Sequence, residues 1–260
     1  MIRLFILLLI TINLNAFEDD DIDGVQNSND LCPNTSFEDT VDEDGCPENQ
    51  SYLGKLTLTL GSDINFDDTT TTDYTFYSNY NYNLWDFSLY NAQQSSLDSN
   101  NNKIKSTGDL YFSSSYSIIK ENFYTTFSLG IKFPIGASSV STKENDYFSS
   151  LDINYVINEK TSLLYSLSYT YTGDNNETNY KNPISQSLGV GYMINDKWYS
   201  SLSYQHSNSI YTDSEDYKAI NFSNNYSFNK SLFTTLDYIE GFDKLSYKRI
   251  VSIRVGVTFE

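Results

Sequence analysis

Apolar and polar residues alternate with a repeat of two positions along most of residues 51–260. The most regular examples are 123–133, 161–172 and 248–259. Alternate side chains point to opposite faces of an extended strand, whereas a helical face repeats every 3.6 residues. The pattern therefore predicts strands with one apolar face and one face of small polar residues.

Twelve segments carry this alternation, and their lengths are close to the ~9–11 residues that a tilted strand needs to cross a bilayer. They are 52–61, 73–82, 84–92, 107–118, 122–133, 146–157, 161–172, 184–194, 197–206, 217–228, 230–239 and 248–259. Five short links fall at 83, 120–121, 158–160, 195–196 and 229, and six long polar links at 62–72, 93–106, 134–145, 173–183, 207–216 and 240–247. Short turns at one end and long loops at the other are typical of bacterial outer-membrane barrels.

The fold expected for residues 51–260 is therefore all-β, a transmembrane antiparallel up-and-down β-barrel of about 12 strands. A soluble β-sandwich also alternates and is the alternative, but its apolar face favours Leu, Ile and Val. Here that face is crowded with Tyr and Phe. Trp85 and Trp198 directly follow short turns on the apolar parity, which suits an indole at a membrane interface.

A few charged residues share the polar parity and are expected to line the lumen. They are Lys55, Asp86, Lys132, Asp152, Asp237 and Arg254. Asp237 and Arg254 lie on neighbouring strands, where we expect an ion pair. A barrel of twelve strands is wider than eight-stranded barrels, whose interior is filled by side chains, and narrower than the open porins of 16–18 strands. We therefore expect a narrow, porin-like channel for ions or small polar solutes, with a closed structural barrel as the alternative.

The chain begins with Arg3, the apolar run Leu4 to Ile10, and Ala16 before an acidic stretch. This order predicts a signal peptide over residues 1–16 and export to the outer membrane of a Gram-negative cell. A retained transmembrane helix is the alternative, but the run is shorter than the ~20 apolar residues that such a helix needs.

Residues 17–50 hold 12 acidic residues and no Lys or Arg. This segment therefore contributes −12 to the net charge of −18 carried by the whole chain. Counted from Asp19 as position 1, Asp21 is at 3, Asp23 at 5, Gly24 at 6 and Asp30 at 12, which is the oxygen-ligand spacing of a calcium loop. A disordered acidic tail is the alternative. In an exported protein, Cys32 and Cys46 predict one disulfide, worth roughly 3 kcal/mol for a loop of this size.

The same segment resembles the thrombospondin type 3 repeat, through the aspartates up to Asp30, Cys32-Pro33, Thr35, Val41-Asp42 and Gly45-Cys46-Pro47. Similar repeats occur in relatives of the outer membrane protein A family, although no peptidoglycan-binding domain follows here. The resemblance implies calcium coordination by Asp19, Asp21, Asp23, Asp30 and the carbonyl of Val25. It also implies a second, incomplete ion site at Asp42 and Asp44. Since an even number of strands puts both barrel ends at the short-turn side, the segment is expected in the periplasm.

The sequence also bears on two other classes of function. Outer-membrane phospholipase is a twelve-strand barrel with a His and a Ser on its outer rim, and this chain has one histidine, His206. The sequence that follows, Ser207-Asn208-Ser209, lacks that family's His-x-Ser-Asn-Gly pattern, so we expect no enzyme. Cell adhesion through the long loops remains open, because any exposed loop has their composition.

The charge balance also bears on partners. An acidic chain has no basic patch for the phosphates of nucleic acid, so nucleic acid is not expected. Outer-membrane lipid and lipopolysaccharide are the expected surroundings, with divalent ions bridging acidic loops and anionic sugar. The terminal Phe259-Glu260 resembles the signal that the barrel assembly machinery reads.

Overall fold

The structure is a computed structural model. It describes residues 19, 21–26, 30, 32, 35, 41–47, 54–66, 70–97, 103–136, 143–173, 180–211, 214–243 and 248–259, with the backbone alone for 94–97 and 103–105. The chain divides into two units, Met1–Glu48 and Asn49–Glu260, which are described separately. The predicted signal peptide, 1–16, lies outside the described residues.

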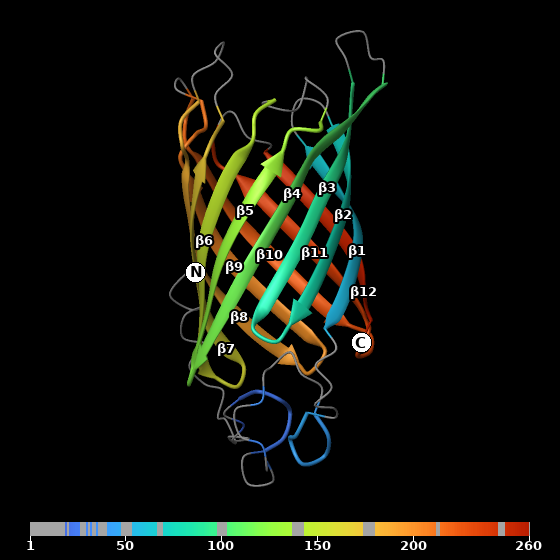
Figure 1. Cartoon of the computed structure of the whole chain (residues 1–260), viewed down its shortest axis with the longest axis vertical. Coiled ribbons are helices and arrows are strands. Elements are labelled where there is room, and N and C mark those ends of the chain that lie inside the picture. The colour runs from blue at the N-terminus through green and yellow to red at the C-terminus, as the bar shows by residue number, and fades with distance from the viewer. Residues whose placement is uncertain are drawn as a thin grey trace, which may run out of the picture. The chain divides into compact units, whose positions relative to one another are not determined.

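Twelve antiparallel strands form one closed barrel in the second unit (Figure 1). Their bounds are β1 Lys55–Phe66, β2 Thr70–Tyr82, β3 Trp85–Leu97, β4 Lys103–Lys120, β5 Phe123–Phe133, β6 Asp146–Asn158, β7 Thr161–Tyr171, β8 Ile184–Asn195, β9 Trp198–Ser207, β10 Tyr217–Ser227, β11 Leu232–Gly241 and β12 Arg249–Phe259. Each strand pairs with its neighbours in sequence, and β12 pairs with β1 from Leu56↔Phe259 to Phe66↔Arg249. The predicted all-β fold and strand number are confirmed.

Closure gives every strand two hydrogen-bonded neighbours, so the sheet has no free edge. A sheet without a free edge is required inside a bilayer, because no water is present there to form hydrogen bonds with exposed backbone groups. Within the described residues, no helix is long and apolar enough to cross a membrane.

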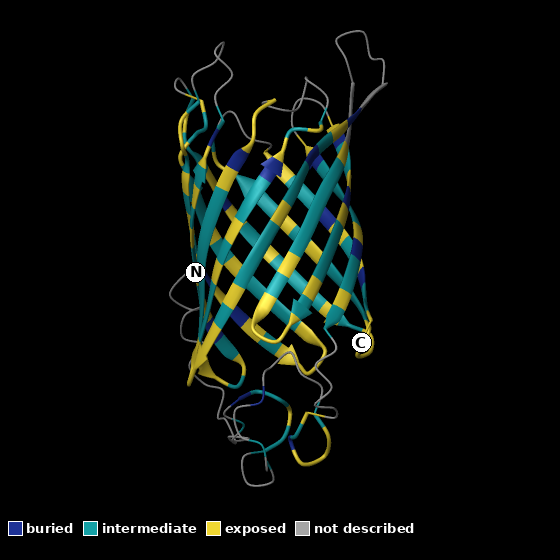
Figure 2. Ribbon diagram, viewed as in Figure 1, coloured by how far each residue is buried: buried dark blue, intermediate teal, exposed yellow. Residues whose placement is uncertain are grey.

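Apolar side chains lie on the outside of the barrel. Exposed and less exposed positions alternate along each strand (Figure 2), and the exposed ones include Leu60 at 66%, Leu188 at 62% and Phe127 at 50%. Among the described residues, Ala219 is the one fully buried hydrophobic residue. A β-sandwich buries its apolar faces between two sheets, so this distribution excludes the sandwich.

Two of the six predicted long links are wrong. Most of 62–72 and 93–106 extends the flanking strands, and the links that remain, 67–69 and 98–102, lie outside the described residues. Asp63 pairs with Asp73 and Asn65 with Thr71 in the β1–β2 ladder. The extensions of β2, β3 and β4 are mostly polar on both faces, so they lack the alternation by which a strand is recognised, although their backbone groups still pair. β1 continues to alternate through Ile64 and Phe66, and its extension was missed although the signal is present.

Both tryptophans are exposed, and both come directly after short links. The Trp85 ring lies 5.0 Å from that of Tyr116, and Trp198 Nε1 donates to Asn224 Oδ1 at 3.1 Å. An apolar ring with its N–H satisfied at the end of the strand is the arrangement found in aromatic girdles.

Candidate functional site

The inner wall of the barrel is lined by small hydroxyl side chains that bond to one another across strands. Ser88 and Ser113 are joined at 2.6 Å, Ser115 and Ser128 at 2.9 Å, and Thr57 and Thr258 at 3.0 Å. Such bonds run along the wall, so they hold the hydroxyl groups against it and provide a polar surface.

Two of the larger inward side chains are paired with glycines. Phe148 on β6 lies directly opposite Gly130 on β5, and Phe233 on β11 lies opposite Gly256 on β12. A Cβ added at either glycine would collide with the phenyl ring. Each ring therefore occupies the space that a side chain on the neighbouring strand would fill. The rings lie along the wall instead of across the lumen.

Arg254 on β12 joins three strands through two carboxylates. Its Nη1 lies 2.5 Å from Asp237 Oδ2 on β11, and its Nη2 lies 2.8 Å from Asp63 Oδ1 on β1. The ion pair expected between Asp237 and Arg254 is present. Asp63 escaped prediction because it lies beyond the expected end of the first strand.

Lys132 is the centre of a second, more deeply buried group. Its Nζ lies 2.5 Å from Asp146 Oδ2 and 3.6 Å from Asp109 Oδ2, with the lysine side chain 4% exposed. Asp109 Oδ1 accepts the N–H of Gly136, and Asp146 Oδ1 accepts the N–H of Gly173. The group therefore fixes the first residues of two long links to the end of the wall. Asp146 shares the parity of Asp152, so alternation alone could have identified it.

Three further inward carboxylates are held by neutral donors. Asn65 Nδ2 donates to Asp73 at 3.0 Å, Asn79 Nδ2 to Asp86 at 2.5 Å, and Ser150 Oγ to Asp152 at 2.9 Å. The remaining predicted lumen residue, Lys55, is the first residue of β1 and lies opposite Asn81 on β2.

The N-terminal segment forms a compact acidic loop. The two carboxylate oxygens of Asp19 accept the N–H groups of Ile22 and Gly24 at 2.8 and 2.9 Å, and Asp23 Oδ1 accepts that of Val25 at 2.8 Å. Asp19, Asp21 and Asp23 each place an oxygen within 4.8 Å of the others. The structure thus brings together the first three predicted ligands.

Asp30 lies beside Gly45, on the same side as Asp23. A Cβ at Gly45 would collide with Asp30 Oδ1 and lie 3.2 Å from Asp23 Oδ2. Burial raises the pKa of Asp19 to about 6. Burial, together with the charges of Asp21 and Asp30, also raises the pKa of Asp23.

Asp23 Oδ2 is buried and accepts no hydrogen bond. A buried, unsatisfied carboxylate oxygen among other carboxylates suits a hard cation, which takes oxygen ligands. The residues present therefore fit the calcium ion that the sequence implies.

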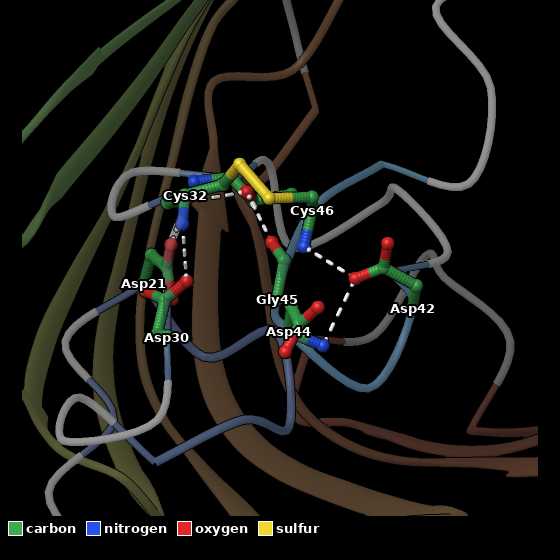
Figure 3. The surroundings of a disulfide bond; sticks show 8 residues. Asp21, Asp30, Cys32, Asp42, Asp44, Gly45 and Cys46 are labelled. Carbon is green, nitrogen blue, oxygen red and sulfur yellow. Dashed lines mark hydrogen bonds between the residues drawn. A yellow bond between two sulfur atoms is a disulfide. The ribbon is translucent and has the colours of Figure 1, made fainter.

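Cys32 and Cys46 form the expected disulfide, with their Cα atoms 5.0 Å apart (Figure 3). Thr35, which sequence reasoning missed, connects the disulfide to the acidic loop. Its N–H donates to Asp21 Oδ2 at 2.6 Å, and its hydroxyl lies 2.8 Å from the carbonyl oxygen of Cys32. The repeat pattern contains a threonine at this position, but the pattern alone gave it no role.

Asp42 and Asp44 lie in a separate turn between Val41 and Pro47, and both are exposed. Asp42 Oδ1 accepts the N–H groups of Asp44 and Cys46, each at 3.0 Å (Figure 3). Among the described residues, the structure does not bring these two aspartates into the group of Asp19, Asp21 and Asp23.

His206 lies at the outer rim of β9, with Nε2 3.5 Å from Asp216 Oδ2. The nearby serines are bonded elsewhere: Ser207 Oγ donates to the Asn208 carbonyl at 3.1 Å, and Ser209 Oγ accepts the N–H of Tyr211 at 3.0 Å. A serine nucleophile needs its hydroxyl within reach of the base. The serines next to His206 in sequence do not provide that arrangement.

No protein-family model and no curated protein matches the chain. Solved structures do match. An outer membrane channel from Pseudomonas putida F1 superimposes with a TM-score of 0.67 at 13% identity, covering 82% of this chain and 99% of that one. The NanC porin gives 0.56 at 12% identity, with coverages of 79% and 99%, and the KdgM porin gives 0.53 at 11%, with 78% and 98%. At these identities the likeness is one of fold.

Proposed function

We propose that the barrel is an outer-membrane channel for ions or small polar solutes. The observation that carries this proposal is the inner wall: small hydroxyls bond along it, and Phe148 and Phe233 lie over glycines. The apolar outer surface fits a lipid surrounding. That three structures of the same fold are a channel and two porins adds support.

The proposal extends to the N-terminal segment, which we infer to be a calcium-binding repeat similar to the thrombospondin type 3 repeat. Asp19, Asp21, Asp23 and Asp30 would hold the ion, which would screen the mutual repulsion of their charges. β1 begins and β12 ends at the barrel end that carries the short links, as Leu56 pairs with Phe259. In an outer-membrane barrel that end faces the periplasm, so we place the segment there.

The channel proposal is tested by recording from the refolded full chain in planar lipid bilayers. We expect discrete unitary current steps in potassium chloride, and none from a heat-unfolded sample at the same concentration. If the folded barrel inserts, as shown by protection of its strands from protease in lipid vesicles, yet gives no steps, the barrel is a structural or adhesive surface protein.

The calcium proposal is tested by titrating calcium into the full chain and measuring binding heat. We expect one site that Asp23→Asn weakens by tenfold or more. Glu43→Gln is the control, because Glu43 is exposed in the 41–47 turn and belongs to no proposed site. Equal affinities for the two variants, or no binding heat, would contradict the proposal.

A further inference from the structure

The inner wall carries an excess of negative charge. Within the described strands, the inward parity holds three cations and seven aspartates. The cations are Lys55, Lys132 and Arg254, and the aspartates are Asp63, Asp73, Asp86, Asp109, Asp146, Asp152 and Asp237. The net charge of this wall is −4, which is more than half of the −7 carried by residues 51–260.

Most of the positive charge is already neutralised locally. Arg254 bonds to both Asp63 and Asp237, and Lys132 lies between Asp109 and Asp146. Each of these two groups therefore keeps a net charge of −1. At these two places the carboxylates outnumber the cations, so neither group attracts an anion.

Asp73, Asp86 and Asp152 add to the excess from β2, β3 and β6. They accept hydrogen bonds from the neutral side chains of Asn65, Asn79 and Ser150, respectively. A hydrogen bond from an amide or a hydroxyl favours the charged form of a carboxylate and fixes its direction without cancelling its charge. Asp73 and Asp86 lie on the neighbouring strands β2 and β3 but near opposite ends of that pair, and Asp152 lies on β6, so the excess is not one local cluster.

Asp73 gives an independent indication. Its Oδ1 is buried and accepts no hydrogen bond, and Asp73 lies directly opposite Asp63 in the β1–β2 ladder. Like charges directly opposite each other are destabilising unless something screens them. The inner wall therefore carries two neighbouring carboxylates here, of which Asp63 is paired with Arg254.

We propose that the lumen selects small cations over anions, and that Asp73, Asp86 and Asp152 are its selectivity-determining residues. This proposal rests on the channel function proposed above. In 0.1 M salt the Debye length is about 10 Å, so wall charges act on ions throughout a narrow lumen. A wall potential of about one kT enriches monovalent cations and depletes anions by ~2.7-fold each, a permeability ratio of about seven.

The test is the reversal potential of the refolded full chain in a planar bilayer with a tenfold potassium chloride gradient. We expect a potassium-to-chloride permeability ratio of about seven at 0.1 M mean salt. The ratio should approach one at 1 M salt, where the Debye length shrinks to about 3 Å. In the triple variant Asp73→Asn, Asp86→Asn, Asp152→Asn we expect it to fall at least threefold, with unitary steps retained.

A matched control removes the same number of charges from the short links, in the triple variant Glu121→Gln, Glu159→Gln, Asp196→Asn. This control should keep the wild-type reversal potential. A wild-type channel that conducts with a ratio of one or below overturns the selectivity and leaves the channel function standing. Equal changes of the reversal potential in the two triple variants also overturn it. The selectivity would then come from charges at the end of the barrel that carries the short links, not from the inner wall. A folded, inserted barrel without current overturns both proposals.

Discussion

The barrel and the N-terminal acidic segment satisfy their backbone groups in opposite ways. Each barrel strand bonds to a neighbour on both sides, from Lys55 round to Phe259. In the segment, carboxylates replace the ladder: the side chains of Asp19, Asp23, Asp30 and Asp42 accept backbone N–H groups. Buried backbone groups need partners in either case.

The difference affects how each region should respond to damage. A barrel ladder is a repeated structure, so the loss of one side chain leaves its pairing intact. The segment has almost no apolar residues and depends on a disulfide, on Thr35 and on its carboxylates. Substitutions in the segment should therefore destabilise the segment alone. The stability of the barrel should fall most where a substitution leaves a buried charge without its partner.

The largest effect is expected at Lys132. Lys132→Met leaves Asp109 and Asp146 buried without their cation, and breaking such a pair costs about 3–5 kcal/mol. We expect the barrel's free energy of unfolding in urea to fall by that amount, measured by tryptophan fluorescence in lipid vesicles. Lys120→Met, at an exposed position on β4, should change it by less than about 0.5 kcal/mol. Similar losses in both variants would show that the Lys132 group carries no special stability.

The next effect concerns the segment. Replacing both cysteines, in Cys32→Ser, Cys46→Ser, should destabilise it by roughly 3 kcal/mol, the value for a closed loop of this size. We expect faster hydrogen exchange in residues 19–47 and unchanged exchange in β1–β12. A barrel that also exchanges faster would mean that the two regions stabilise each other.

Removal of calcium should have a slightly smaller effect. At a calcium concentration of 100 times Kd, binding contributes about 2.7 kcal/mol to the stability of the folded segment. With a chelator we expect cleavage by protease within residues 17–50, and the same strand content by circular dichroism. A barrel that unfolds in chelator would contradict the separate roles of the two regions.

The smallest effect is expected from overpacking of the inner wall. Gly130→Val adds bulk beneath the Phe148 ring and should cost about 1–3 kcal/mol of barrel stability. Adding Phe148→Ala should recover much of this loss, because the ring that collides is gone. Ser168→Val adds bulk on the same inner face, on β7 opposite Ser150, and serves as the control. An equal loss in Ser168→Val, or no recovery in the double variant, would contradict the glycine–aromatic pairing.

The strands of the barrel could be predicted because each strand has one face toward lipid and one toward the lumen. Apolar and polar residues therefore alternate along it over nine or more positions. Prediction failed over 70–72 and 93–106, where both faces of the strands are mostly polar and alternation disappears. The pairing of Asp237 with Arg254 followed from parity and strand order. The second partner, Asp63, did not, because the first strand was predicted to end at residue 61 although the alternation continues through Ile64 and Phe66.

The acidic segment shows a different limit. Ligand spacing identified Asp19, Asp21, Asp23 and Asp30; the structure groups the first three and places Asp30 and Asp23 beside Gly45. Spacing gave Thr35 no role, because its hydrogen bonds depend on how distant parts of the loop meet. The second ion site at Asp42 and Asp44 stays a prediction; in the structure the Asp42 carboxylate accepts the N–H groups of Asp44 and Cys46.

The most direct test of the central claim, a polar lumen kept open by rings that lie on the wall, is the unitary conductance of the Gly130 series in planar bilayers. Wild type should give discrete steps, Gly130→Val smaller steps because Phe148 is displaced into the lumen, and Gly130→Val, Phe148→Ala steps at least as large as those of wild type. Inserted, folded wild-type barrel that gives no steps at any voltage would contradict the account.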